Sequence, residues 1–158
     1  MAKTVSQSLT FEQAQQKASA LCSGSEYCIS EIEEKIRKWG VQGGDAQKVV
    51  DYLVDEKYID EARYAMAYTN DKLRFSHWGR VKIRSMLRMH KISDIDINRA
   101  FSFIDEVEYD DILRKVIESK QRTMREDIES YAARVKIIRF ALQRGFEMDQ
   151  ITKFISEY

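Results

Sequence analysis

The residues best suited to chemistry are a row of arginines in the middle of the chain. Arg80, Arg84 and Arg88 recur at every fourth position of a segment with helical periodicity, so they share one side of the predicted helix. From residue 72 to residue 91 there are 7 basic residues and no acidic one. Such a row attracts anions, either nucleic-acid phosphates or an acidic protein groove. The predicted binding set, here called the basic stripe, is Arg80, Arg84, Arg88, Lys91, Lys72, Arg74 and Lys82.

A purely structural interpretation of the basic stripe competes with the functional one. Like charges four residues apart cost roughly 0.2–0.5 kcal/mol per pair, and no acidic residue of the same helix offsets this. The functional interpretation predicts that the three arginines are largely exposed and not all paired. It also predicts that replacing them together with glutamine leaves stability nearly unchanged. In the alternative, nearby carboxylates neutralise the stripe, and the candidates are Asp94, Asp96, Asp105 and Glu106.

A second basic patch lies further along the chain. No acidic residue occurs between Tyr131 and Phe146. The basic residues of this interval are more scattered around their predicted helix, so the patch is a secondary candidate for partner binding. It comprises Arg134, Lys136, Arg139 and Arg144.

Catalytic and metal-binding patterns are not found. His77 and His90 are the only histidines and lie near opposite ends of one predicted helix, so they are not expected to hold a metal together. Cys22 and Cys28 are not in a Cys-x-x-Cys arrangement, and no cluster of histidines surrounds them in the sequence. Glycine-rich phosphate loops and nucleophile motifs are also missing. We therefore expect a protein that is not an enzyme and uses no cofactor or metal.

The chain contains three copies of one apolar pattern. The copies align on Gly40, Lys91 and Gly145, which gives a period of about fifty residues. The chain has no proline, and its six glycines lie at the edges of periodic segments, where helices end. The sequence predicts an all-α protein of three tandem three-helix repeats, at 10–57, 58–105 and 106–158, after a flexible segment 1–9. Stacked repeats favour an elongated, curved monomer, with a single compact bundle as the alternative.

Helix boundaries follow from capping signals. Thr10 and Gln13 have capping-box spacing, Asp45 and Asp60 are expected to cap helices, and Ser93 or Asp94 is expected to cap another. The third repeat is expected to begin near Tyr109. The polar segment 120–127 reads as a loop or a helix end, and a longer helix is expected to end at Arg144.

Composition restricts the class of protein. A net charge of zero argues against indiscriminate nucleic-acid binding. No apolar run approaches the roughly 20 residues that span a membrane, and the first residues do not resemble a signal peptide. The expected location is the cytoplasm.

The middle of the chain resembles the RecX family of bacterial recombination regulators. The segments 58–68 and 78–87 follow the family pattern of an aspartate, Arg-Tyr-Ala, a tyrosine, and an aromatic-glycine pair before a basic helix. The residues 144–146, Arg-Gly-Phe, look like the same motif in the family's third repeat. Tyr27-Cys28 departs from the family's usual serine, and Ala141 stands where leucine is common. The matching positions that we expect to be structural are Asp60, Arg63, Tyr64, Tyr68, Trp78 and Gly79.

The resemblance implies a function that the residue pattern alone does not reach. RecX-like proteins bind the filament of the RecA recombinase on single-stranded DNA, lodge in its helical groove and inhibit its growth and activities; they are not enzymes. The alternative is a helical-repeat protein that binds nucleic acid directly, without a recombinase. A scaffold that binds only proteins also fits the repeats but leaves the basic stripe unexplained.

Overall fold

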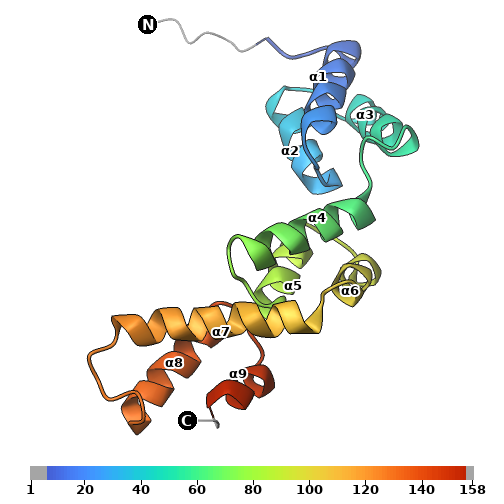
Figure 1. Ribbon diagram of the computed structural model, residues 1–158. Coiled ribbons are helices and arrows are strands. Elements are labelled where there is room, and N and C mark those ends of the chain that lie inside the picture. The colour runs from blue at the N-terminus through green and yellow to red at the C-terminus, as the bar shows by residue number, and fades with distance from the viewer. Residues whose placement is uncertain (1–6, 156–158) are drawn as a thin grey trace, which may run out of the picture. The chain divides into compact units, whose positions relative to one another are not determined.

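The computed structural model describes residues 7–155, and all the regular structure within them is helical (Figure 1). The all-α fold predicted from the repeats is confirmed. Within the described residues, the chain forms two compact units. The N-terminal unit comprises residues 7–64 and the turn 90–92, and the C-terminal unit comprises residues 65–89 and 93–155. The predicted boundaries of the three repeats and the elongated form of the array stay predictions.

The N-terminal unit is built on three helices and the start of a fourth. They are α1 (Phe11–Gly24), α2 (Ile29–Lys38), α3 (Gly44–Asp55) and the first turn of α4 (Glu61–Arg74). Ala14 and Ala18 are fully buried, and their small side chains allow α1 to pack closely on α3. Ile32, Val49 and Leu53 complete the core, with no exposed surface.

The C-terminal unit contains the rest of α4 and five further helices. They are α5 (Arg80–Met89), α6 (Asp94–Ser102), α7 (Glu106–Thr123), α8 (Tyr131–Gln143) and α9 (Met148–Ile155). Their core includes Ile83, Leu87, Leu113, Ile137 and Ile151, each buried. The long helix α7 packs on both α8 and α9. None of the described helices is long and apolar enough to cross a membrane.

Most predicted helix ends are correct, and the exceptions have local causes. The Thr10–Gln13 capping box is present, Asp60 accepts from the Arg63 amide, and Ser93 caps α6. Asp45 does not cap α3, because Gly43 takes that place with a positive φ of 62°. Its carboxylate lies in the first turn instead.

The helix α7 begins earlier than the expected start near Tyr109. Asp105 accepts hydrogen bonds from the amides of Val107 and Glu108, so α7 starts three residues before Tyr109. The same helix continues through the first half of the polar segment 120–127 and ends at Thr123. Of the predicted flexible segment 1–9, residues 1–6 lie outside the described residues. Leu9 is ordered, since its amide donates to the Trp39 carbonyl at 2.9 Å and its side chain packs on the core.

The three anchors of the repeat pattern are left-handed turns that end the second helix of each repeat. Gly40, Lys91 and Gly145 have φ values of 81°, 60° and 91°. After α8, the amide of Phe146 donates to the Ala141 carbonyl and that of Gly145 to the Leu142 carbonyl. This is the Schellman arrangement, in which the residue after the left-handed turn is apolar and buried. Phe146 is 1% exposed, which explains why an apolar residue follows each anchor.

One of these turns docks on the start of another helix at very short range. The carbonyls of Arg144 and Gly145 accept from the amides of Gly79 and Val81, at 2.8 and 2.9 Å, so they cap the start of α5. A Cβ atom on Gly79 would lie 2.4 Å from the Gly145 oxygen. We call this contact between the turn 144–146 and the start of α5 the C-terminal junction. Only glycine allows it.

We expect Gly79→Ala to destabilise the protein by about 1–3 kcal/mol, since the added methyl group overpacks a site bounded by backbone. Urea unfolding followed by circular dichroism measures the change. Gly44→Ala is the matched control, because a Cβ there meets nothing within 4 Å and φ is not positive; its stability should stay equal or rise slightly. Equal stability of the two variants would contradict the close approach.

Candidate functional site

Arg80, the first residue of the basic stripe, is mostly buried in an ion-pair network. Its side chain is 17% exposed and pairs with Glu106 and with Glu147, the latter at 3.3 Å. Its guanidinium carbon lies 3.9 Å from the centre of the Tyr109 ring. The prediction that Arg80 is largely exposed is wrong. The carboxylates come from the start of α7 and from the turn before α9, which the sequence of α5 alone cannot reveal.

Arg84 and Arg88 share one carboxylate. Asp94 lies 3.9 Å from Arg84 and 3.0 Å from Arg88, and the hydrogen bond from Arg88 holds the pKa of Asp94 below its usual value. The prediction that the three arginines are not all paired is therefore wrong as well. Neutralisation by Asp94 and Glu106, the alternative interpretation, is what the structure has, with Glu147 added. Asp105 caps α7 instead.

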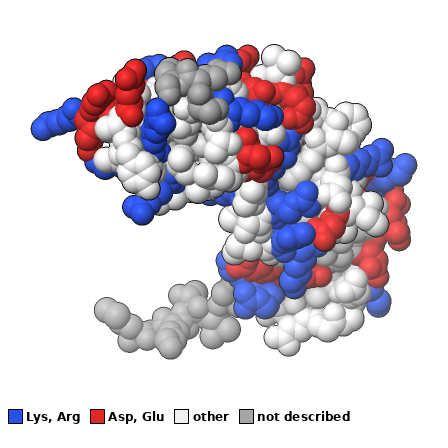
Figure 2. Space-filling view, turned by 90° about the horizontal axis from the view of Figure 1, so that it is seen from below, with Lys and Arg blue, Asp and Glu red and all other residues white. Residues whose placement is uncertain are grey.

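The accessible surface of α5 combines basic, acidic and apolar side chains. A groove of about 460 Å³ is lined by Arg80, Val81, Arg84, Ser85, Arg88 and Glu147. Val81 is 56% exposed and the Arg88 side chain 57%. Figure 2 shows basic side chains next to acidic ones over much of the face in view, as expected for zero net charge. The groove thus offers the exposed guanidinium group of Arg88 and the partly exposed one of Arg84 beside an apolar side chain.

The other members of the basic stripe do not join this groove. Lys72 and Lys82 place their ammonium groups 4.8 and 4.3 Å from the centre of the Trp78 ring, and Lys72 is also near the Tyr68 ring. Arg74 makes a two-pronged contact with Glu108. Lys91 is exposed in the turn after α5 and belongs to the N-terminal unit.

The secondary basic patch is also divided. Lys136 pairs with Glu126, which lies in the loop before α8. Arg144 donates to the Ser76 carbonyl at 3.1 Å and lies over the Phe140 ring. Arg134 is half-buried, and Arg139 is exposed.

Two residues of the family motif, Arg63 and Tyr64, form hydrogen bonds that connect α4 to other segments of the N-terminal unit. Arg63 donates to Glu26 at 2.6 Å and to the carbonyls of Lys57 and Tyr58, which ties the start of α4 to the preceding loops. Tyr64 is buried and donates to Glu31 at 3.1 Å. Burial raises the pKa of Tyr64, so its hydroxyl stays protonated and able to donate.

Tyr109 is a key residue that the sequence reasoning missed. Its hydroxyl accepts from the Arg80 amide at 3.1 Å and donates to Glu147 at 2.5 Å. Burial, and then the bond to Glu147, raise its pKa. A signal was present, because Glu106 and Tyr109 have the same spacing as Glu61 and Tyr64 one repeat earlier.

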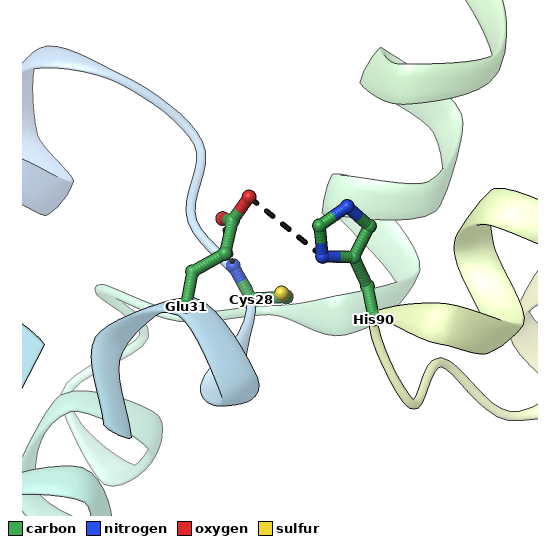
Figure 3. A group of neighbouring side chains, drawn as sticks. All are labelled: Cys28, Glu31 and His90. Atoms are coloured by element: carbon green, nitrogen blue, oxygen red, sulfur yellow. Dashed lines mark hydrogen bonds and ion pairs between the residues drawn. The ribbon is translucent and has the colours of Figure 1, made fainter. Parts of the chain in front are cut away.

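The structure also corrects the expectation about cysteine surroundings. His90 lies next to Cys28 and Glu31, with one potential ligand atom of each within 4.8 Å of the others (Figure 3). His90 follows the end of α5, while the other two residues lie at the start of α2. The sequence distance of about sixty residues concealed this group.

Comparison with known proteins places the chain in a family. The profile of the RecX second three-helix domain matches residues 60–100, and that of the RecX third three-helix domain matches residues 107–155. The regulatory protein RecX of Acinetobacter baylyi is 32% identical over 139 residues, which covers 87% of this chain and 83% of the relative. This chain belongs to the RecX family.

Further RecX proteins resemble this chain in sequence or in fold. The regulatory protein RecX of Vibrio campbellii is 24% identical over 90% of both chains. The crystal structure of RecX from Lactobacillus salivarius has a TM-score of 0.81 at 22% identity, covering 93% of this chain and 95% of that one. A second solved structure, of a regulatory protein RecX, has a TM-score of 0.79. The RecX helical-repeat fold is therefore shared.

The arginine contacts predict unequal effects of substitution. Arg80→Gln should destabilise this RecX-family protein by about 1–3 kcal/mol, because it leaves the partly buried carboxylate of Glu147 without its charged donor. Arg88→Gln, on an exposed side chain, should change stability by no more than about 0.5 kcal/mol. Thermal melts of both variants test this. This prediction replaces the expectation that joint substitution of the three arginines leaves stability unchanged. Equal melting temperatures of the two variants would show that the Arg80 ion pairs do not stabilise the fold.

Proposed function

We propose that this protein regulates homologous recombination and DNA repair by binding the RecA–DNA filament and inhibiting its growth and activity. Membership of the RecX family carries the proposal, since the relatives that cover most of this chain are named regulatory proteins. The proposed partner is RecA on single-stranded DNA, in the cytoplasm, and the protein acts as a monomer without enzymatic activity of its own.

The contacts of the basic stripe leave only part of it as a proposed partner surface, on the outer side of α5. Arg80 is mostly buried in contacts within the C-terminal unit, so it is not offered to a partner. Arg84, Arg88 and the exposed Val81 remain on the outer side of α5. A phosphate or a partner carboxylate could compete with Asp94 for Arg88, because an exposed ion pair contributes only about 0–1 kcal/mol. We propose this face of α5 as a contact surface for the filament.

The second candidate function is direct binding of nucleic acid without a recombinase. The observation that favours it is the pair of lysines over Trp78, which leaves an aromatic ring and two cations together. Rings beside cations can stack single-stranded bases. Against it stand the zero net charge and the mixing of acidic and basic side chains.

A RecA assay separates the two functions. Substoichiometric amounts of the protein should lower the DNA-dependent ATP hydrolysis and strand exchange of RecA from the same organism, because loss of filament removes active subunits. An unchanged RecA rate together with tight binding to free single-stranded DNA would reject the regulator and support the direct binder.

Substitution of the α5 face tests the proposed surface. The double variant Arg84→Gln with Arg88→Gln should need several-fold more protein for the same inhibition and should show a flatter salt dependence, since fewer ionic contacts form. Arg114→Gln is the matched control, because Arg114 is an equally exposed arginine paired with Asp111 on α7. If both variants inhibit like the wild type, the face of α5 is not the contact surface.

A further inference from the structure

Three residues with different ligand atoms meet where the turn 90–92 touches α2. Cys28 immediately precedes α2, Glu31 lies in its first turn, and His90 precedes the left-handed Lys91. Their thiol, carboxylate and imidazole groups point toward one another in Figure 3, with ligand atoms within 4.8 Å. All three belong to the N-terminal unit.

The surrounding contacts hold this group in place. One carboxylate oxygen of Glu31 accepts from the Cys28 amide at 3.2 Å, which leaves the other oxygen 3.9 Å from Nδ1 of His90. The Ser30 hydroxyl donates to the His90 carbonyl at 2.9 Å and lies 3.2 Å from Sγ of Cys28. Tyr64 donates to the same Glu31 oxygen that faces His90, at 3.1 Å. Such outer hydrogen bonds orient metal ligands and are part of a working metal site.

We propose that Cys28, Glu31 and His90 bind a divalent transition-metal ion of the zinc type. Sulfur, imidazole nitrogen and carboxylate oxygen are the three ligand kinds that Zn²⁺ takes in proteins. A thiolate ligand selects against Mg²⁺ and Ca²⁺, which prefer oxygen alone. On binding, the S–H bond of Cys28 breaks, the metal–sulfur bond forms and the proton passes to water.

The distances suit this proposal. Zinc–ligand bonds of about 2.0–2.3 Å place the atoms of a tetrahedral site roughly 3.3–3.7 Å apart. The largest separation here therefore has to shrink by about 1 Å, which rotation of the half-exposed Glu31 and His90 side chains supplies. Three protein ligands leave the fourth position for a water molecule.

Metal binding would fasten the start of α2 to the turn that follows α5. An ion that binds the folded protein alone raises its stability by mass action, by about 2.7 kcal/mol when its concentration is one hundred times the dissociation constant. Without the ion, the same residues remain joined by hydrogen bonds, so the apo protein folds. The proposal is therefore independent of RecA binding and of the proposed function.

Titration of the reduced full-length protein with Co²⁺ tests the site. Cobalt bound to a thiolate gives an absorption band that free cobalt lacks, and added Zn²⁺ should remove it. We expect one Co²⁺ per chain, with the band lost, or the affinity lowered at least about tenfold, in Cys28→Ser and in His90→Gln. Zn²⁺ should also raise the melting temperature of the wild type and leave that of Cys28→Ser unchanged.

The chain supplies its own controls, because it has one further cysteine and one further histidine. Cys22→Ser and His77→Gln should keep the cobalt band, since neither residue belongs to the group. The proposal is overturned if the wild type gives no thiolate–cobalt band, or if the control variants lose it as the ligand variants do. Should Cys28→Ser fold poorly in circular dichroism, His90→Gln and Glu31→Gln decide.

Discussion

The whole fold depends on a left-handed turn docking on the start of another helix. A three-helix repeat ends its second helix at such a turn, and the apolar residue after it enters the core. The turn 144–146 presents backbone carbonyls to the unpaired amides at the beginning of α5. At the beginning of α2, the acceptor is the carboxylate of Glu61, from the first turn of α4. Helix starts that would otherwise need water are satisfied by another part of the chain.

The docking of the turn 144–146 on α5 also explains why Arg80 is mostly buried while Arg88 is exposed. Arg80 must stand at the start of α5, where the turn 144–146 arrives together with Glu147, and where α7 begins with Glu106 and Tyr109. A cation there neutralises two carboxylates that the junction brings in, so its charge serves the fold. Arg88 lies at the opposite end of α5, where it pairs with Asp94 and stays half exposed. Position relative to the junction thus decides which arginine is mostly buried and which stays exposed.

Sequence reasoning recovered what depends on local pattern. The left-handed anchors, the capping box at Thr10 and the helical class all follow from residues close in sequence, and the fold agrees with them. It failed where partners lie far apart along the chain: Glu147 is 67 residues from Arg80, and His90 is 59 from Glu31. A helix read alone shows uncompensated charge, because the compensating carboxylates are on other helices. The paired spacing of Glu61–Tyr64 and Glu106–Tyr109 was the one local trace of these contacts.

The turn 90–92 meets the start of α2 much as the turn 144–146 meets the start of α5, and we call this contact the N-terminal junction. The two junctions satisfy the amides at a helix start with different atoms, and the difference follows from two residues. At the C-terminal junction, Gly79 and Gly145 have no side chains, so backbone meets backbone and the carbonyls cap α5 directly. The corresponding positions of the other junction are Cys28 and Lys91, whose side chains prevent so close an approach. The amide of Ile29 donates to the carboxylate of Glu61 at 3.0 Å, whereas the corresponding amide of Arg80 donates to the Tyr109 hydroxyl.

The wider spacing at that junction changes its chemistry. The space that the glycines close at one junction is filled at the other by Cys28, Glu31, Tyr64 and His90, which are polar and hydrogen-bonded. A backbone junction leaves no room for an ion, whereas a side-chain junction collects ligand atoms from two segments. The replacement of a glycine pair by cysteine and lysine is thus what makes a metal site sterically possible in the N-terminal unit and impossible at the C-terminal junction.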